Sequence, residues 1–537
     1  MKSNRLLALL PVIVAIALAS GVYLGRKMSL SGEQFLFSNS EFSHDDKLQQ
    51  IISYIKSDYV DSVRSQEIIE ETIGEILQNL DPHSYYIPKQ KYDEMNDPLE
   101  GEFEGIGVEF RIQEDTITVV QALAGGPSEE LGIIAGDRII EVEGEDVTGK
   151  TINNRRVVKL LKGPKGTVVN VLIRRKGATK PIDFAIRRDK IPVYSVEAEY
   201  MINETTGYVK VLRFAKDTHE EFMRAMGKLK KQGMTKLVLD LRNNTGGFMK
   251  SAIDMCDEFL PKGKLIVYTE GKARSKREYF ATSRGKLEDI KVTILINENS
   301  ASASEILAGA LQDNDIGYIV GRRSFGKGLV QEGMQWPDGS AVRLTVARYY
   351  TPTGRSIQKS YEGGIEDYNN ESYERYNNGE LLSQDSIDFP DSLKYVTEGG
   401  KVVYGGGGIM PDVFVPIDTT GTSYYLGSLN YQGIFFQFGF HYVDVHRKEL
   451  KANYKVENFA SDFKVDAKLL EEMYAFAETK GIERDKEGAK VAEETIKNRL
   501  SASIGRNLYR EKIFYQILNE NDIVVKRAVD LLKKEAL

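Results

Sequence analysis

Three serines stand in a run of small residues whose setting suits nucleophilic chemistry. Ser300, Ser302 and Ser304 alternate with alanines and are followed by Glu305. The apolar, β-branched run at residues 292–296 predicts a buried strand before them, and a helical pattern follows them. A hydroxyl at a strand-to-helix turn lies beside free N–H groups and the positive end of the helix dipole. This position suits a nucleophile whose attack creates an oxyanion.

The same residues are also typical of a helix cap. A serine hydroxyl can accept a hydrogen bond from the first turn of a helix, and Glu305 stands where a capping box places its acid. A nucleophilic interpretation therefore depends on finding a base elsewhere in the chain.

A lysine is the candidate for that base, because none of the five histidines stands in a recognisable catalytic motif. Lys327 lies between Gly326 and Gly328, which allow the backbone to approach another segment closely. Desolvation can lower the pKa of a lysine from about 10.4 to the roughly 7 to 8 that a base needs. Gln331 lies four residues on, in the next predicted strand, where it can orient the amine. An exposed turn is the alternative explanation of the Gly-Lys-Gly run, and no P-loop pattern is present.

Five motifs accompany these residues. They are Asp-Leu-Arg-Asn-Asn-Thr-Gly-Gly at 240–247, Ser-Ala-Ser-Ala-Ser-Glu-Ile at 300–306, Phe-Gly-Lys-Gly-Leu-Val-Gln at 325–331, Thr-Pro-Thr-Gly-Arg-Ser-Ile-Gln at 351–358 and Gly-Ile-Met-Pro-Asp at 408–412. Together they resemble the carboxy-terminal processing, or tail-specific, serine proteases over about residues 44–418.

The resemblance assigns roles to individual residues. It implies Ser302 as the nucleophile, Lys327 as the base and Gln331 as the residue that supports the base. It also implies an oxyanion hole that uses the N–H of Ala303 and one N–H from the glycine pair, for which we expect Gly246, with Gly247 as the alternative. It implies no metal and no cofactor.

The elements that must position these residues form an α/β protease core at residues 190–423. Strands and helices alternate there, which favours a largely parallel central sheet, and the resemblance implies a crotonase/ClpP-like core. Asp240 and Arg242 are interpreted as a structural ion pair. Residues 361–400 interrupt the pattern with an acidic, tyrosine-rich stretch, which we expect to be a partly mobile surface insertion.

An inserted β-rich domain is expected at residues 90–189. The turn Gly105-Ile106-Gly107-Val108 enters a strand, and a Gly-Asp-Arg-Ile-Ile-Glu-Val turn follows at residues 136–142. This order resembles a PDZ domain of the circularly arranged bacterial form. The N–H groups of residues 105–108 would receive a peptide carboxylate, and the neighbouring strand edge would take an extended peptide by β-addition. A small β-domain that only packs on its neighbour is the alternative.

Both ends of the chain carry helical patterns. Residues 28–89 are expected to form a helical N-terminal region and residues 424–537 a helical C-terminal extension, and by analogy either end can support a homodimer. Residues 1–27 are expected to be a signal or anchor segment, because the stretch 6–24 carries no charge and is flanked by basic residues. It is long enough for a transmembrane helix, and Ala17-Leu18-Ala19 is an alternative cleavage site. A buried core helix is the third interpretation.

Composition narrows the function further. The net charge of -7 gives no electrostatic footprint for nucleic acid, and a single cysteine, Cys256, excludes an internal disulfide. We expect an endopeptidase on the periplasmic side of the cell envelope, anchored to the inner membrane by residues 6–24 or secreted after cleavage. Its substrates would be proteins with flexible C-terminal tails. A PDZ scaffold with a degenerate enzyme fold and a crotonase-like acyl-thioester enzyme are the rival hypotheses.

Overall fold

The computed structural model describes residues 14–24, 44–113, 115–387 and 389–534. The chain divides into two compact units, residues 1–76 and 77–537. The segment 6–24, expected to be an anchor or signal, lies partly outside the described residues, and residues 28–43 of the expected helical N-terminal region lie wholly outside them. Residues 14–24 are helical. Across the described residues, no helix combines the length and apolarity needed to cross a bilayer.

The first unit is helical where it is described. It contains α2, His44–Asp58, and most of α3, Ser65–Gln78. Apolar side chains of α2 are largely exposed, among them Leu48 at 43% and Ile51 at 50%. The helices follow the apolar spacing of the sequence.

A six-stranded sheet forms the centre of the second unit, in the order β10-β11-β12-β15-β16-β21. β10 is antiparallel to β11, and all other neighbours are parallel, which confirms the predicted α/β core. The strands are β10 Val196–Met201, β11 Thr206–Val211, β12 Lys236–Asp240, β15 Lys291–Ile296, β16 Tyr318–Gly321 and β21 Val413–Phe414.

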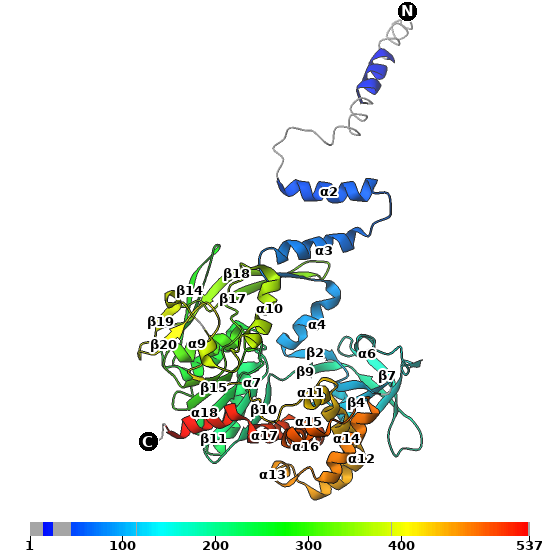
Figure 1. The fold of residues 1–537 in the computed structure, drawn as a ribbon. Coiled ribbons are helices and arrows are strands. Elements are labelled where there is room, and N and C mark those ends of the chain that lie inside the picture. Colours follow the sequence, from blue (N-terminus) through cyan, green and yellow to red (C-terminus); the bar gives the residue numbers. More distant parts are fainter. Residues whose placement is uncertain (1–13, 25–43, 114, 388, 535–537) are drawn as a thin grey trace, which may run out of the picture. The chain divides into compact units, whose positions relative to one another are not determined.

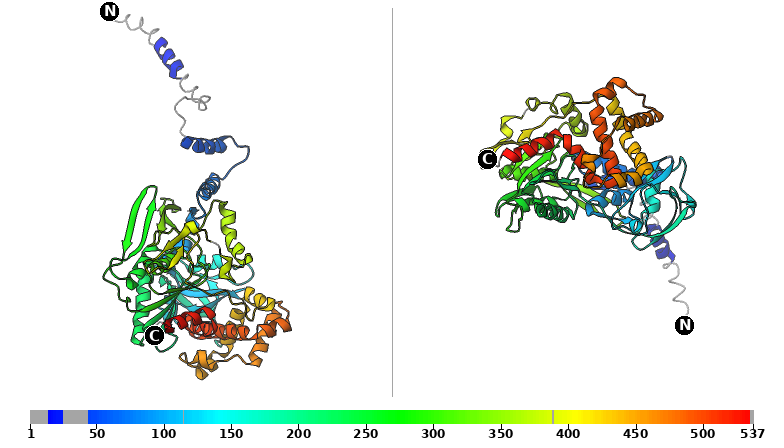
Figure 2. Two further views of the ribbon diagram at one scale, coloured as in Figure 1. Left: turned by 60° about the vertical axis from the view of Figure 1, so that its left-hand side comes forward. Right: turned by 90° about the horizontal axis from the view of Figure 1, so that it is seen from below.

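Helices cover both faces of this sheet (Figure 1). They are α7 Thr218–Lys231, α8 Met249–Phe259 and α9 Ala303–Asp313 on one face and α18 Ile523–Lys534 on the other. Because successive side chains of a strand point to opposite faces, Leu237 and Leu239 pack with α7 to α9 while Val238 packs with α18. Figure 2 shows α18, in red, lying along the core strands. Helix α18 is therefore part of the α/β core.

A second sheet stands beside the first. Its order is β1-β18-β13-β14, and β17 pairs with β18. The strands are β1 Tyr85–Ile87, β13 Leu265–Gly271, β14 Arg274–Phe280, β17 Leu329–Gln335 and β18 Ala341–Tyr350. β1 lies in the region 28–89 that the sequence predicts to be helical. Three residues are too few to show an alternating pattern, and only pairing with the distant β18 makes this segment a strand.

The residues expected to form a PDZ domain make a sheet in the order β3-β4-β5-β7-β8, with β6 paired to β5. The elements are α4 Lys89–Glu100, β2 Glu102–Gly105, β3 Val108–Gln113, β4 Thr116–Ala122, α5 Pro127–Glu130, β5 Arg138–Val142, β6 Glu145–Asp146, α6 Asn154–Leu161, β7 Val168–Arg174, β8 Ile182–Arg187 and β9 Asp189–Pro192. β2 and β9 pair with each other, which brings the two ends of this β-rich segment together. The side chain of Asn153 caps α6, and Val157 and Leu161 bury its apolar face.

The acidic insertion, expected to be a partly mobile surface segment, is mostly exposed and contains regular elements. It contains α10 Gly364–Asn377, the short 3-10 helices Gln384–Ser386 and Asp391–Leu393, and strands β19 Lys394–Val396 and β20 Val402–Tyr404. Tyr368 and Arg375 of α10 are only 4% and 3% exposed. Glu371 and Glu380 of the insertion pair with Arg323 of the core, which composition alone does not show; the expected partial mobility stays a prediction.

The C-terminal helices precede α18 and have an apolar core of their own. They are α11 Tyr424–Tyr431, α12 Ile434–Asn453, α13 Phe459–Asp462, α14 Ala467–Thr479, α15 Lys486–Val491, α16 Glu493–Tyr509 and α17 Glu511–Asn521. This confirms the helical pattern predicted for the end of the chain.

Candidate active site

The three candidate serines have different surroundings. Ser300 Oγ donates to the carbonyl of Leu241 at 2.9 Å, and Ser304 Oγ donates to the carbonyl of Asn244 at 2.9 Å. Both serines are fully buried. Ser302 is the one of the three that lines the large cleft of this unit. The outer two serines therefore fasten the turn to the neighbouring segment, and the middle one faces the space that a substrate can enter.

Ser302 sits on a strained turn at the start of α9. Its φ of 55° is unusual for a residue with a side chain. Gly246 packs directly behind it, since a Cβ added there would lie 2.8 Å from the Cβ of Ser302. Such a sharp turn between a strand and a helix pushes a hydroxyl outwards. The turn thus holds the partly buried Ser302 in a fixed position at the cleft.

Glu305 links the serine turn to the segment that carries Lys327. Its carboxylate accepts hydrogen bonds from the N–H of Ser302 at 2.7 Å and from the N–H groups of Gly326 and Lys327 at 2.7 and 2.9 Å. Ser324 Oγ donates to the same carboxylate. Burial raises the pKa of Glu305 to about 7, against the opposing effect of these hydrogen bonds. One side chain thus ties the backbone of the serine turn to the backbone around Lys327.

Lys327 belongs to a loop between β16 and β17, residues 322–328, which we call the lysine loop. Gly328 packs so closely on the backbone of Gln358 that an added Cβ would lie 2.9 Å from its nitrogen. Gly326 has a φ of 92°, a conformation that favours glycine. The two glycines therefore let the loop lie against a neighbouring segment while Lys327 points into the cleft.

The Lys327 amine has a neutral partner. Its Nζ donates to Gln331 Oε1 at 2.9 Å, and no carboxylate of the described chain forms an ion pair with it. Burial, aided by the positive charge of Arg343, lowers the pKa of Lys327 to about 8. A lysine with this pKa is partly deprotonated near neutral pH, as a general base must be.

Gln331 is fixed in turn by His83. Gln331 Nε2 donates to the backbone carbonyl of His83, so its amide oxygen is aimed at Lys327. Burial and the charge of Lys327 lower the pKa of His83 to about 4. His83 is therefore neutral at neutral pH and adds no second charge beside the amine.

The two expected oxyanion donors differ in availability. Ala303 is the first residue of α9, where an N–H has no acceptor within the helix. The N–H of Gly246, however, donates to Asn244 Oδ1 at 2.9 Å. Within the part of the chain that the structure describes, the N–H of Gly247 makes no hydrogen bond. The geometry thus favours the alternative, Gly247, over Gly246, whose N–H serves to fix the turn.

The cleft that joins these groups has a volume of about 1120 Å³. Ser302, Lys327 and Gln331 line it, together with the apolar side chains of Met249, Ile306 and Leu329. Its mixed lining suits an extended peptide with an apolar residue near the serine.

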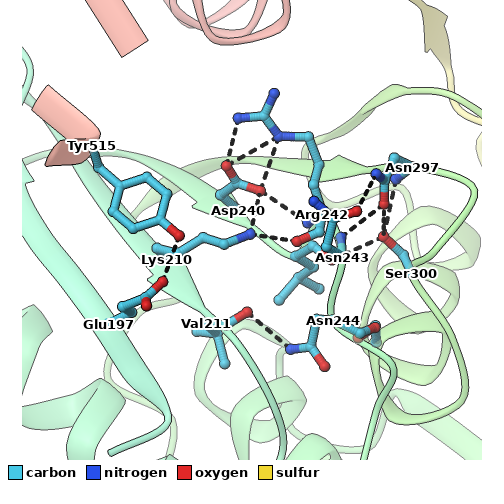
Figure 3. A network of polar contacts seen from close by, with 12 residues as sticks. Glu197, Lys210, Val211, Asp240, Arg242, Asn243, Asn244, Asn297, Ser300 and Tyr515 are labelled. Atoms are coloured by element: carbon cyan, nitrogen blue, oxygen red, sulfur yellow. Dashed lines mark hydrogen bonds and ion pairs between the residues drawn. The ribbon is translucent and has the colours of Figure 1, made fainter. Parts of the chain in front are cut away.

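The motif around Asp240 forms a closed polar network (Figure 3). Arg242 Nη2 lies 2.6 Å from Asp240 Oδ2, and Lys210 Nζ lies 3.2 Å from Asp240 Oδ1. Although burial alone would raise it, the charges of Arg242 and Lys210 hold the pKa of Asp240 below its ordinary value. Arg242 also pairs with Asp522, just before α18. This geometry agrees with a structural ion pair that fixes the turn of Gly246 and Gly247.

The four residues expected to receive a peptide carboxylate lie between β2 and β3. Gly105, Ile106 and Gly107 are buried, and Val108 begins β3. The carbonyl of Ile106 accepts hydrogen bonds from the N–H and the hydroxyl of Ser128. The N–H groups of Ile106 and Gly107 have no acceptor among the described residues, so they are available to a ligand.

Two site residues were not predicted from sequence. Glu305 was interpreted only as part of a helix cap, and Tyr349 was not considered. The Tyr349 hydroxyl lies 3.1 Å from the carbonyl oxygen of Ser302 and 2.7 Å from that of Lys327. Because Tyr349 lies on β18, no local pattern relates it to either residue; Glu305 could have been suspected from its fixed spacing after Ser302.

Comparison with known proteins gives three family matches. The model of peptidase family S41 matches residues 205–368, a PDZ domain model matches residues 118–175, and a family of unknown function (DUF8443) matches residues 425–510.

Two curated relatives agree with the peptidase match, and one solved structure is similar to this chain. The carboxy-terminal-processing protease of Bartonella bacilliformis is 36% identical over 350 residues, which cover 64% of this chain and 80% of the relative. The carboxy-terminal processing protease CtpA of Bacillus subtilis is 35% identical over 359 residues, 66% of this chain and 74% of the relative. The solved structure of a photosystem II D1 C-terminal processing protease is 26% identical, with a TM-score of 0.36, covering 70% of this chain and 88% of that one.

Proposed function

Because the chain belongs to peptidase family S41, the carboxy-terminal processing proteases, we propose that it is an exported serine endopeptidase with a Ser302/Lys327 dyad. It would recognise the C-terminal tails of proteins through its PDZ domain and cleave them in the cleft. The crotonase/ClpP-like description of its core is part of this proposal.

The observation that carries the proposal is the state of one amine. Lys327 lines the same cleft as Ser302 and is bound to a neutral amide, with a pKa lowered to about 8. A lysine paired with a carboxylate would stay protonated, whereas Lys327, which is bound to a neutral amide, can lose its proton and then accept one.

The chemistry then follows from the positions of these groups. Neutral Lys327 takes the proton of Ser302 Oγ as this oxygen attacks the scissile carbonyl carbon. The oxyanion is stabilised by the N–H groups of Ala303 and Gly247, of which one donor is typically worth about 3 kcal/mol. The Lys327 ammonium protonates the leaving amine, and water hydrolyses the acyl-enzyme with Lys327 again as base.

The substrate tail would bind as an extended strand. β17 pairs with β18 along one edge, and its residues Leu329, Val330 and Gln331 line the cleft. An extended peptide can add to such an edge through main-chain hydrogen bonds. The loop at residues 105–108 would hold the terminal carboxylate. A flexible tail fits this scheme, whereas a folded one presents no free strand.

Export rests on the sequence of residues 1–27. We propose that residues 6–24 anchor the protein to the inner membrane with its protease on the periplasmic side, and a homodimer is compatible with the helical ends. Cell fractionation with carbonate extraction tests this: recovery of the full-length protein in the extracted membrane supports an anchor, and recovery of a shortened soluble protein contradicts it.

A fluorophosphonate probe tests the proposed nucleophile. We expect labelling at Ser302, located by peptide mapping, together with cleavage of an unstructured peptide that has a free C-terminus. Ser302→Ala should lose both, while Ser461→Ala, a change at an exposed serine of α13, should keep both. Cleavage by Ser302→Ala would refute the assignment.

The tail-recognition step needs a separate test. An otherwise identical peptide with an amidated C-terminus should be cleaved more slowly because the N–H groups of the 105–108 loop lose their charged acceptor. Equal rates for the two peptides would contradict carboxylate recognition while leaving the dyad untouched.

A further inference from the structure

Helix α10 of the insertion holds the backbone of the lysine loop. The guanidinium of Arg375 donates to the carbonyl of Arg323 at 2.7 Å and to the carbonyl of Ser324 at 3.1 Å. Arg375 is 3% exposed. A planar guanidinium can satisfy two carbonyls in one fixed geometry, so this contact fixes the loop three residues before Lys327.

A buried ion cluster holds Arg375 in place. Glu380 lies 2.7 Å from Arg323 and 2.8 Å from Arg375, and Glu371 of α10 lies 3.4 Å from Arg323. Removing Glu380 would leave the buried Arg375 without its ion-pair partner, which is costly. The cluster therefore makes α10 and the start of the lysine loop one rigid piece.

Lys359 provides a second connection. Its backbone N–H donates to the carbonyl of Gly326 at 2.9 Å, and its amine donates to the carbonyl of Tyr368 at 2.8 Å. The same amine lies 4.3 Å from the ring centre of Phe325 and 3.9 Å from that of Tyr368. Lys359 thus joins the centre of α10 to the glycine that precedes Lys327.

The third connection reaches Lys327 from its other side. The hydroxyl of Tyr368 lies 2.7 Å from His83 Nε2, and the two rings pack edge to face with centres 5.2 Å apart. The carbonyl of His83 accepts from Gln331, and Gln331 accepts from the Lys327 amine. A change at Tyr368 can therefore reach the amine through two residues.

From these three connections we infer that α10 is a working part of the active site, in which Tyr368 and Arg375 are positioning residues that hold the partly buried Lys327 amine against the neutral amide of Gln331. The inference rests on the proposed function. The outer face of the same helix lacks such contacts: Tyr373 is 69% exposed.

The test is a pH profile because a general loss of structure would not shift it. The charged and titratable groups that face Lys327 are Arg343, Glu305, Asp81 and His83, and none of them is replaced in Tyr368→Phe. That variant loses only the hydroxyl, which contacts His83 and hydrogen-bonds the side chain of Gln358. If Gln331 and the amine then loosen and admit water, the pKa of Lys327 returns towards its ordinary value.

We expect the rate of fluorophosphonate labelling at Ser302 to show this shift. In Tyr368→Phe the apparent pKa of labelling should rise by about one unit, with a rate about tenfold lower at pH 7 and equal to the native rate near pH 10. Tyr373→Phe, on the same helix, should keep the native profile. A Tyr368→Phe profile that overlays the native one, or that is lowered equally at every pH, overturns the inference.

Arg375→Lys is the second variant, since it keeps the charge but loses the fork to two carbonyls. It should show an upward shift of the same sign, and a native profile in this variant counts against the inference. Labelling rates are calculated for the molecules that become labelled, so that unfolded protein does not affect them. A variant with a smaller labelled fraction but an unshifted pH profile also contradicts the inference. If the native protein is not labelled at Ser302 at any pH, the proposed function is wrong. If the native protein is labelled and the two variants show the same pH profile as the native protein, the proposed function stands and only this inference is wrong.

Discussion

Two lysines of this molecule, one near the end of a core strand and one on the lysine loop, have opposite partners. Lys210 of β11 is 4% exposed and pairs with the carboxylate of Asp240. Lys327, on the lysine loop, is partly buried and donates to the neutral amide of Gln331. The first amine is surrounded by groups that stabilise its charge (Figure 3), whereas burial lowers the pKa of the second to about 8.

The difference shows that burial alone does not make a lysine reactive. A buried amine with a carboxylate partner contributes to the fold as half of an ion pair. A buried amine with an uncharged partner costs stability while it is protonated, and it can act as a base when it is not. The identity of the nearest acceptor therefore separates the structural lysine from the proposed catalytic one.

The largest expected effect comes from removing the reactive amine. Lys327→Met should lower peptide cleavage by about 10⁴-fold or more, because nucleophile and base act as a unit. In the native protein the pKa of Lys327 is lower in the folded state than in the unfolded state, so the charged amine lowers the stability of the fold at pH 7. This loss of stability disappears as the pH rises from about 8 to above 10. The variant should therefore melt at the native temperature or higher at pH 7. A cleavage rate that recovers with pH would indicate another base.

Removing the other lysine should have the opposite outcome. Lys210→Met takes one of two cations from the buried Asp240 and should lower the free energy of unfolding by about 3 kcal/mol, measured by denaturant titration. Lys228→Met, at a mostly exposed lysine with a surface ion pair, is the control and should change stability by less than about 1 kcal/mol. Labelling of Ser302 per folded molecule should survive Lys210→Met. Loss of labelling without loss of stability would erase the distinction between the two lysines.

Much of this arrangement was predictable because it is local in sequence. The serine turn follows from one apolar strand and one helix, and Lys327 and Gln331 are four residues apart. The strand and helix pattern from residue 190 onwards predicted the parallel core that the structure shows. The resemblance supplied the roles.

The remainder depends on contacts between distant residues. No pattern links Tyr368 to His83, which lie 285 positions apart, and acidic composition does not show that Glu371 and Glu380 pair with Arg323. The N–H of Gly246 is engaged because Asn244 turns its side chain back towards it, which a motif does not reveal. Likewise, the sequence of α18 indicates only an amphipathic helix, and the contact with Val238 of the core sheet is seen only in the structure.

A third change should make Lys327 resemble Lys210. Gln331→Glu places a carboxylate where the amine now meets an amide, so the ammonium form is stabilised and the pKa of Lys327 rises. Cleavage at pH 7 should fall about 10- to 100-fold and recover at high pH. Gln331→Met, which removes the acceptor without adding a charge, is the matched control and should lower the rate without an upward shift of the profile. Equal profiles for the two variants would show that charge at this position does not decide the reactivity of Lys327.

The smallest effect needs no mutation. If Lys327 is the base, the rate of Ser302 labelling in the native protein should rise about tenfold for each pH unit below a midpoint near 8 and then level off. The sign follows from the neutral amine being the active form, whose fraction grows as the pH approaches the pKa from below. His83, with its pKa of about 4, is already neutral over this range and cannot produce the rise. A midpoint near 6.5 would instead point to an ordinary histidine as the base. Lys327 would then have no proposed catalytic role that distinguishes it from Lys210.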